Sequence, residues 1–384
     1  MAVYFDNAAS APPSPTVTKR FVEVLTEHYA NPSSLSERGM RADQVIQESR
    51  QVIADTLGAL PEEIYFTSGG TESDNWAIFG TALGYRREGK HILTSATEHP
   101  AVAEPFRRLG EEGYEVEVLP VDERGYVLPE TLAAALRPDT ILVSIIAANN
   151  ETGCVQDLEA LGKAIRQKAP QALFHVDAVQ AYGKMRLPVH RWGIDLLSAS
   201  GHKFHTPKGL GFLYIKKGKK VQPLLWGGGQ QSGKRSGTEN AAGAAALAQA
   251  AREAYDGLEA HAEQVRAVKE TLWNGLQALG GVTLNGPGLA EASPYVLNVG
   301  FENIRSETLL HALEARGVLV SAGSACDSHK KRHSATLTAM GLRGDRLEGS
   351  VRFSFSRYNT VAEAEECLGV LNEVVPFLRR YNRR

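Results

Sequence analysis

Between residues 64 and 215, segments with the composition of strands alternate with segments that have the periodicity of helices. Short apolar runs with the length of buried strands occur at residues 64–67, 91–95, 114–119, 140–147, 172–176, 194–198 and 211–215. Helical patterns lie between several of them, at residues 71–85, 100–112, 130–136 and 158–168. Strands separated by helices of this length form βαβ units, so we predict an α/β fold built on a mostly parallel, seven-stranded sheet.

The alternation ends before the last third of the chain. A helical region covers about residues 240–279, and beyond Pro287 the order becomes strand, helix, strand, loop, helix, strand and a final helix from Val361. At 384 residues the chain also exceeds the size at which a single core stops growing. We therefore predict a large α/β domain over residues 15–258, and a smaller α+β domain made of residues 1–14 and 259–384.

The charge of the chain is balanced, with 42 basic and 44 acidic residues and a formal net charge of -2. General nucleic-acid binding is therefore not expected. The N-terminus has no charged start followed by an apolar run, and no stretch of 18 apolar residues occurs, which disfavours secretion and membrane insertion. Cys154, Cys326 and Cys367 are too few and too scattered for a disulfide framework or a zinc site. We expect a cytoplasmic protein without a structural metal.

The segment Ile194-Asp-Leu-Leu-Ser-Ala-Ser-Gly-His-Lys203 runs from an apolar strand into a polar tip. If residues 198–203 lie at the carboxyl end of a parallel strand, they lie where open α/β sheets bind ligands. Lys203 is then either a solvated loop lysine or an amine whose pKa is lowered so that it can form a Schiff base. These ten residues alone leave both interpretations open.

Other predicted strand ends carry polar residues that would meet at the same edge. Gly69-Gly70-Thr71-Glu72 lies between a strand and a helix, where backbone N–H groups favour a phosphate, although a tight turn capped by Thr71 explains it equally well. Asp177 is suited to hold a pyridine nitrogen protonated, or simply to cap a helix. His99 and Asn150 each follow a further predicted strand. Instead of binding a ligand, His99 could be an ordinary loop residue and Asn150 an ordinary turn residue. Together these ends offer ligands for one flat, phosphorylated cofactor.

A series of ordered motifs spans nearly the whole chain. They are Phe5-Asp-Asn-Ala-Ala9, Asn31-Pro-Ser-Ser34, Ser68-Gly-Gly-Thr-Glu-Ser-Asp-Asn75, Asn149-Asn-Glu-Thr-Gly153, His175-Val-Asp-Ala-Val-Gln180, Ser200-Gly-His-Lys203, Pro207-Lys-Gly209, Arg235-Ser-Gly-Thr238 and Ser321-Ala-Gly-Ser-Ala-Cys326. In these motifs the chain resembles the pyridoxal-phosphate-dependent cysteine desulfurases of the NifS and IscS type, a branch of the fold-type I aminotransferase-like enzymes.

The resemblance implies a role for each matching residue in holding pyridoxal 5'-phosphate. Lys203 would be the Schiff-base lysine, Asp177 the partner of the pyridine nitrogen, and His99 the residue that stacks on the ring. Gln180 and Asn150 would approach the oxygen substituent of the ring. The phosphate would be held by Gly70, Thr71, Ser200 and His202, and by Thr238 reaching across the interface of an obligate homodimer.

The reaction implied by the resemblance removes sulfur from L-cysteine and leaves L-alanine. Cys326 lies among small residues, which suits a mobile, accessible thiol that takes the sulfur as a persulfide. Lys203 would remove the Cα proton, and His99 would carry protons. Arg352 matches the arginine that binds the substrate carboxylate, with Arg357 as the nearby alternative.

The remaining cysteines have different surroundings. Cys367 lies beside apolar positions of a predicted helix, so we expect it in the core. Cys154 follows the Asn149–Gly153 motif, close to the expected cofactor, and its role stays open.

The chain departs from the family pattern at three places. Ser36 replaces a frequent histidine, His205-Thr206 replaces Tyr-Gly, and the basic run His329-Lys-Lys-Arg-His-Ser334 replaces the usual continuation after Cys326. The basic run leaves the sulfur acceptor open, between an iron–sulfur scaffold and a tRNA-thiolation enzyme, and we hypothesise that it favours an acidic partner surface. The alternative functions are a selenocysteine lyase, an aminotransferase of the same fold, and a catalytically silent scaffold for an acceptor protein.

Overall fold

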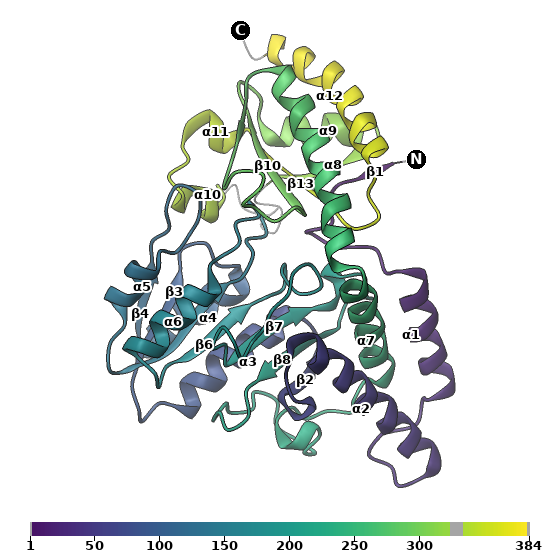
Figure 1. The fold of residues 1–384 in the computed structure, drawn as a ribbon, viewed down its shortest axis with the longest axis vertical. Coiled ribbons are helices and arrows are strands. Elements are labelled where there is room, and N and C mark those ends of the chain that lie inside the picture. Colours follow the sequence, from purple (N-terminus) through teal and green to yellow (C-terminus); the bar gives the residue numbers. More distant parts are fainter. Residues whose placement is uncertain (1, 323–332, 382–384) are drawn as a thin grey trace.

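The protein has a broad lower part and a narrower upper part, which the long helix α8 (Leu258–Leu279) connects (Figure 1). This computed structural model describes residues 2–322 and 333–381. Cys326 and the basic residues 329–332 lie outside the described residues. Within the described ranges, no helix combines the length and the apolar character that a membrane crossing requires.

The lower part is built on a seven-stranded sheet, which confirms the predicted fold class. Its strands, in spatial order, are β2 (Ile64–Thr67), β8 (Gly211–Ile215), β7 (Leu196–Ser200), β6 (Leu173–Asp177), β5 (Thr140–Ile146), β3 (His91–Ser95) and β4 (Glu115–Leu119). Only β8 runs antiparallel to its neighbours in this sheet, so the other strands all point the same way. Their carboxyl ends therefore share one edge.

The inner strands of this sheet are buried on both faces, because their alternate residues enter different hydrophobic clusters. Phe174 and Leu197 pack in one cluster, and Leu173 and Leu196 pack in another on the opposite face. The helices of the lower part are α1 (Pro15–Glu27), α2 (Glu37–Leu57), α3 (Gly70–Gly84), α4 (Pro100–Glu111), α5 (Pro129–Ala135), α6 (Leu158–Lys168) and α7 (Ala241–Asp256). This two-sided burial explains the long apolar run of an inner strand such as β5, whereas β4 at the edge of the sheet is largely exposed.

The upper part contains a four-stranded antiparallel sheet with its own hydrophobic cluster. Its strands, in spatial order, are β12 (Ser321–Ala322), β13 (Ser350–Ser354), β10 (Val296–Phe301) and β9 (Val282–Leu284). The helices around it, besides α8, are α9 (Ser306–Glu314), α10 (Ala335–Ala339), α11 (Gly344–Glu348) and α12 (Val361–Tyr381). α8 and α12 lie side by side (Figure 1).

The N-terminal segment pairs with strands of the upper part, although in the sequence it directly precedes the lower part. β1 (Val3–Tyr4) pairs in parallel with β11 (Val318–Leu319), and Asp6 bridges to Ser354 of β13. Proline-rich residues then lead into α1, whose Ser14 cap accepts the N–H of Val17. The exact domain boundaries at residues 14 and 258 stay predictions.

The strand that leads to Lys203 begins and ends two residues later than expected. We predicted residues 194–198, with Ser198 at the polar tip; β7 instead covers Leu196–Ser200. Ser198 is buried inside the sheet, where its hydroxyl lies 2.9 Å from Nε2 of His175. A serine that finds a partner within the sheet can extend a strand, which the apolar run alone does not reveal.

Candidate active site

One cavity of about 340 Å³ lies at the carboxyl edge of the large sheet. Ten residues from the predicted site line it, namely Gly70, Thr71, His99, Asn150, Asp177, Gln180, Ser200, His202, Lys203 and Arg352. Among the described residues of the predicted site, one does not. Thr238 lines a separate cavity of about 150 Å³ together with Arg235 and Glu239, and Cys326 lies outside the described residues. The fold thus brings together side chains from positions 70 to 352.

Lys203 ends a short 3₁₀ turn that follows β7 directly. Its side-chain amine donates hydrogen bonds to the carbonyl oxygens of Ala8 and Ala9, at 2.7 and 2.8 Å. Ala8 and Ala9 line the cavity, so the N-terminal segment forms part of its wall. The lysine therefore projects into the cavity between both parts of the molecule.

The start of α3 approaches the end of β7 closely because residue 70 is a glycine. A Cβ atom on Gly70 would lie 2.6 Å from Cγ2 of Val179 and 3.4 Å from Cβ of Ser200. The helix begins at Gly70 after Gly69, which has φ 147°, and Gly69 offers no side-chain cap. The alternative of Thr71 as the cap is therefore wrong. The N–H groups of the first turn and the helix dipole favour an anion such as a phosphate at this point.

Asp177 is the last residue of β6 and is almost fully buried. Its Oδ1 atom accepts the N–H of Val179 at 2.9 Å, which holds the carboxyl group in the turn after the strand. Burial raises the pKa of Asp177 to about 6, although the Val179 amide and the charge of Lys203 act in the opposite direction. A cationic ring nitrogen would stabilise the charged form of this carboxyl group.

Two further buried carboxyl groups, Asp74 and Glu98, lie near Asp177. Oδ1 of Asp74 lies 3.6 Å from Nε2 of His175 and has no hydrogen-bond partner among the described residues. Burial and the charge of Asp177 raise the pKa of Asp74 well above its usual value. Burial raises the pKa of Glu98 to about 8, although Ser95 and the N–H of Ile146 donate to its Oε1 atom. Asp74 and Asp177 thus both bring buried carboxyl groups to the lining of the cavity.

His99 caps the N-terminus of α4, and Pro100 occupies the first helical position. Its Nδ1 atom accepts the N–H of Ala101 at 3.1 Å, so the hydrogen of the neutral ring is assigned to Nε2. Burial and the charge of Lys203 lower the pKa of His99 to about 4. The imidazole is therefore held neutral in a fixed orientation at the cavity wall.

Arg352 of β13 enters the cavity from the upper part. Its Nη1 atom donates to the carbonyl oxygen of Asn150 at 3.0 Å, and its Nη2 atom lies 3.0 Å from Oδ1 of Asp6. Asn149 shapes the turn that presents Asn150, because its Oδ1 atom accepts two backbone N–H groups, those of Glu151 and Thr152. The guanidinium is thus fixed against elements of both parts.

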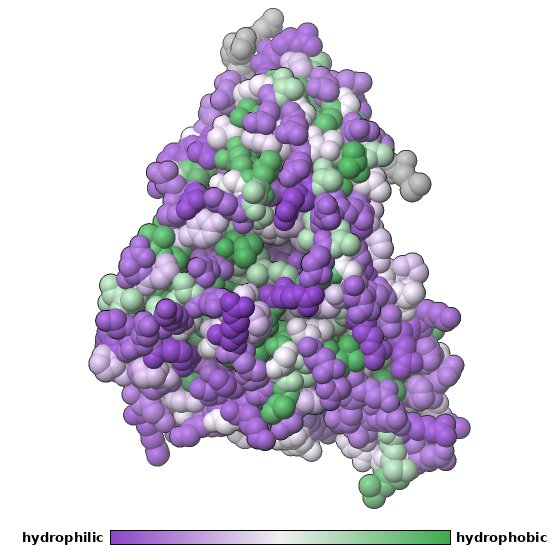
Figure 2. Space-filling view, viewed as in Figure 1, coloured by the Kyte–Doolittle hydropathy of each residue, from purple (hydrophilic) through white to green (hydrophobic). Residues whose placement is uncertain are grey.

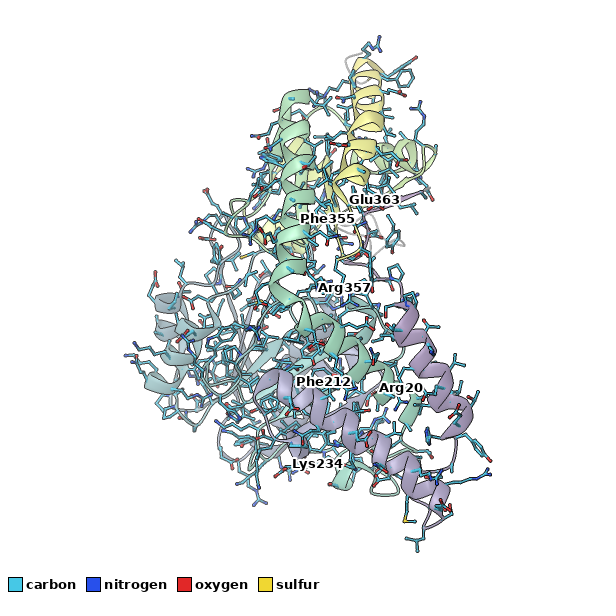
Figure 3. The ribbon with its side chains drawn as sticks, turned by 45° about the vertical axis from the view of Figure 1, so that its right-hand side comes forward. Arg20, Phe212, Lys234, Phe355, Arg357 and Glu363 are labelled. Atoms are coloured by element: carbon cyan, nitrogen blue, oxygen red, sulfur yellow. The ribbon has the colours of Figure 1, made fainter. Side chains whose placement is uncertain are left out.

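Arg357 lies outside this cavity. It forms an ion pair with Glu253 and stacks on the ring of Tyr358, near the junction of α7 and α8 (Figure 3). Of the two arginines considered for the substrate carboxylate, only Arg352 lines the cavity.

Gln180 is held by two contacts. Its Nε2 atom donates to the carbonyl oxygen of Ala8 at 2.9 Å, and its Oε1 atom accepts from the amine of Lys184 at 2.9 Å. Burial and the charges of Lys203 and Arg352 lower the pKa of Lys184 to about 7. Gln180 therefore has a fixed amide orientation.

Both described cysteines are packed in the interior. Cys154 and Cys367 have no exposed surface, and burial raises the pKa of each thiol. The expectation that Cys367 belongs to the core is confirmed. The position of Cys154, whose role the sequence left open, is that of a core residue, so it does not offer an accessible thiolate.

Sequence reasoning missed four charged residues of this region: Asp6, Asp74, Glu98 and Lys184. Asp74 and Glu98 had a weak signal, since Asp74 lies in the Ser68–Asn75 motif and Glu98 directly precedes His99. Asp6 and Lys184 act through contacts between distant segments, and no local pattern reveals such contacts.

The side chains of the cavity fit pyridoxal 5'-phosphate. They offer an amine for its aldehyde, an anion-binding helix start for its phosphate, and buried carboxyl groups, including the unpartnered Oδ1 atom of Asp74, for a cationic ring nitrogen. The three groups lie around one cavity, as a single flat ligand with these functions requires.

Comparisons with known proteins point the same way. The aminotransferase class-V family model matches residues 3–367. The chain is 44% identical to a protein of Methanosarcina thermophila named cysteine desulfurase IscS, over 98% of this chain and 93% of that protein. It is 42% identical to a NifS/IcsS protein homolog of Lactobacillus delbrueckii, over 99% of both.

Solved structures of similar proteins share the fold. One described as a NifS-like protein superposes with a TM-score of 0.93 at 37% identity, covering 98% of this chain and all of that one. Another, described as SspA in complex with cysteine, has a TM-score of 0.80 at 32% identity over 93% of this chain and 99% of that one. The chain therefore belongs to the aminotransferase class-V family, and within it to the pyridoxal-phosphate-dependent cysteine desulfurases of the NifS and IscS type.

Proposed function

We propose that this protein removes the sulfur atom from L-cysteine, releases L-alanine, and retains the sulfur as a persulfide on Cys326. The observation that carries this proposal is that Lys203, Asp177, His99 and Arg352 line one cavity. Relatives named cysteine desulfurase and a related structure described as a complex with cysteine support the choice of substrate.

The side chains that line the cavity would each hold one part of the cofactor. When bound in the cavity, pyridoxal phosphate supplies an aldehyde for the substrate amine and a ring that accepts electrons from Cα. Asp177 would bond to the ring nitrogen, and the start of α3 with Thr71, Ser200 and His202 would hold the phosphate. Gln180 and Asn150 would lie at the ring oxygen.

The amine of Lys203 would hold the cofactor and then take the Cα proton of the substrate, while Arg352 binds its carboxylate with parallel N–H groups. His99, neutral with its hydrogen on Nε2, would move protons beside the bound cofactor. The thiolate of Cys326 attacks the substrate sulfur, so that an S–S bond forms as the C–S bond breaks. The carbon that loses sulfur gains a proton.

A homodimer is part of this proposal, with Thr238 completing the phosphate site of the partner subunit. Thr238 is exposed and lies outside the cavity of its own subunit. The same segment exposes Leu225 and Trp226, and large apolar side chains exposed near each other are typical of an interface. Hydrophobic side chains also gather at the tip between α1 and α2 (Figure 2), where Leu35 is 96% exposed.

We further propose that the protein acts in the cytoplasm and passes its sulfur to an acceptor protein, either an iron–sulfur scaffold or a tRNA-thiolation enzyme. The basic residues Lys330, Lys331 and Arg332 would meet an acidic surface of that acceptor. If neutralising all three leaves transfer to every candidate acceptor unchanged, this part of the proposal fails.

The experiment for the whole function supplies L-cysteine and an excess of a thiol reductant, which reduces the persulfide to sulfide, to the native protein and to Cys326→Ala, and measures sulfide and alanine. We expect both products from the native protein and strongly reduced alanine from the variant. Undiminished alanine formation in Cys326→Ala would rule out a persulfide on this residue as part of turnover.

A further inference from the structure

Gln180, Ala8 and Lys203 form a short chain of hydrogen bonds in the wall of the cavity. Nε2 of Gln180 donates to the carbonyl oxygen of Ala8 at 2.9 Å, and the amine of Lys203 donates to the same oxygen at 2.7 Å. The N–H of Ala8 in turn donates to the hydroxyl oxygen of Ser354 at 2.9 Å, which holds the backbone at Ala8 in place. The carbonyl group of Ala8 therefore fixes the Nε2 end of the Gln180 amide.

Lys184 fixes the other end of the same amide. Its Nζ atom donates to Oε1 of Gln180 at 2.9 Å. A lysine ammonium has three hydrogens and no acceptor, so the reversed amide would place one donor against another. Lys184 thus selects the orientation in which the NH₂ group of Gln180 faces Ala8. That group carries two hydrogens, and the one that Ala8 does not accept can be donated to a ligand in the cavity that Gln180 lines.

The amine of Lys184 is itself held from two sides. Lys184 lies in the turn that follows β6, where its N–H donates to the carbonyl oxygen of Ala181. Gly183 permits this turn, because its φ is 75° and a Cβ atom there would lie 3.0 Å from Cβ of Phe204. The side chain extends to the upper part, where Nζ lies 5.5 Å from the centroid of the Tyr295 ring. Its position therefore depends on both parts of the molecule.

Lys184 contacts Gln180 from outside the cavity. Gln180 lines the cavity of about 340 Å³, whereas Lys184 lines a separate cavity of about 20 Å³, together with His261 and Arg357. Lys203 lines both cavities. The hydrogen bond with Gln180 therefore joins Lys184 to the larger cavity.

We propose that Lys184 is a positioning residue for the cofactor, which fixes the amide of Gln180 so that one N–H of Nε2 is presented to the oxygen substituent of the pyridoxal phosphate ring. This inference rests on the proposed function, which places Gln180 at that oxygen. It adds a residue that touches neither the substrate nor the cofactor. Residues 177–184 would then supply the partner of the ring nitrogen, the partner of the ring oxygen, and the side chain that orients the second.

The test uses the full-length protein and the variants Lys184→Met, Gln180→Leu and the combination of both. One readout is the dissociation constant of pyridoxal phosphate, measured by returning the cofactor to the cofactor-free protein. The other is the midpoint pH of the change in visible absorbance of the lysine-bound cofactor. Neither readout measures turnover, and a merely structural role would not shift the midpoint pH.

A hydrogen bond to the ring oxygen stabilises negative charge there, which favours loss of the proton from the nearby nitrogen that links Lys203 to the cofactor. We therefore expect the midpoint pH to rise by about one unit in Gln180→Leu and by a similar amount in Lys184→Met. The dissociation constant should rise about tenfold in each. Because Lys184 acts through Gln180, the double variant should resemble Gln180→Leu alone rather than show the sum of the two effects.

Two further substitutions separate the loss of this contact from the loss of a buried lysine. Lys184→Arg keeps the charge and the donors, and should restore part of both readouts. Lys269→Met is the matched control, because Lys269 is also buried and its amine donates to the carbonyl oxygen of Ser293 at 2.9 Å, away from both cavities. This variant should keep the native midpoint pH and dissociation constant.

The inference is overturned if Lys184→Met keeps the native midpoint pH while Gln180→Leu shifts it, or if the two effects add in the double variant. An equal shift in Lys269→Met would also overturn it. If Gln180→Leu itself behaves like the native protein, the assignment of Gln180 to the ring oxygen in the proposed function is contradicted instead. Thermal unfolding verifies that each variant is folded. Lys184→Gln, whose amide can present either end to Gln180, replaces Lys184→Met if the latter does not fold.

Discussion

The amine of Lys203 lies 2.7 Å from the carbonyl oxygen of Ala8, although 195 positions separate the two residues in the chain. The N-terminal segment that carries Ala8 is also joined to the upper part, through the pairing of β1 with β11. The lysine at the end of β7 thus meets a segment that the upper part holds in place. A shift of the upper part relative to the lower part would therefore also move the segment that contacts Lys203.

Removing this amine should abolish the covalent attachment of the cofactor. For Lys203→Ala we expect loss of the absorbance of the lysine-bound cofactor, and a fall in sulfide release of at least about a thousandfold, within the range seen when a positioned general base is lost. Lys208→Ala, which removes an exposed lysine five residues away, is the control and should behave like the native protein. Sulfide release from Lys203→Ala at the native rate would contradict the assignment.

The stability of the cofactor-free protein should depend on pH through Glu98. The pKa of this buried carboxyl group is raised to about 8, above the usual 4.5 that it regains on unfolding. Its contribution to stability is therefore fully present below about pH 4.5 and is lost as the pH rises through about 8, at about 1.4 kcal/mol per pH unit where only the native state is protonated.

Chemical denaturation at pH 5 and pH 8 tests this dependence. Glu98→Gln, which cannot ionise, should lose less free energy of unfolding between the two pH values than the native protein. Glu104→Gln removes an exposed carboxyl group nearby and should leave the difference unchanged. An equal pH dependence in Glu98→Gln and the native protein would show that Glu98 ionises normally.

Arg352 and Arg357 should respond differently to the same substitution. Lysine keeps the charge but cannot form two parallel hydrogen bonds with a carboxylate. We expect Arg352→Lys to raise KM for L-cysteine by about tenfold or more, and Arg357→Lys to stay within about threefold of the native value. Steady-state kinetics on both variants distinguish the two, and a larger effect at Arg357 would reverse the assignment.

The large sheet was predictable because its signal is local. β2, β3 and β8 begin and end at the predicted residues, and β3 and β8 are buried along their whole length. β9, β12 and α11 were missed because they are only two to five residues long. Segments this short have little periodicity, and their pairing partners decide their structure.

The cavity residues were predictable for a related reason, since the carboxyl ends of parallel strands converge on one edge whatever the loops do. The contacts of Asp6 with Arg352 and of Lys184 with Gln180 were not predictable. Asp6 and Arg352 are 346 positions apart, and no local pattern of charge or hydrophobicity marks such a pair. The contact of Asp6 with Arg352 arises only when the N-terminal segment packs against β13.

The most direct test of the proposed sulfur transfer to Cys326 follows the sulfur atom itself. The native protein, Cys326→Ala and Cys367→Ala are each incubated briefly with L-cysteine carrying isotope-labelled sulfur, and the peptides are analysed by mass spectrometry. We predict labelled sulfur on Cys326 in the native protein and in Cys367→Ala, and none on any cysteine of Cys326→Ala. Labelled sulfur on Cys154 or Cys367, or alanine formed with no labelled cysteine in the native protein, would contradict this prediction.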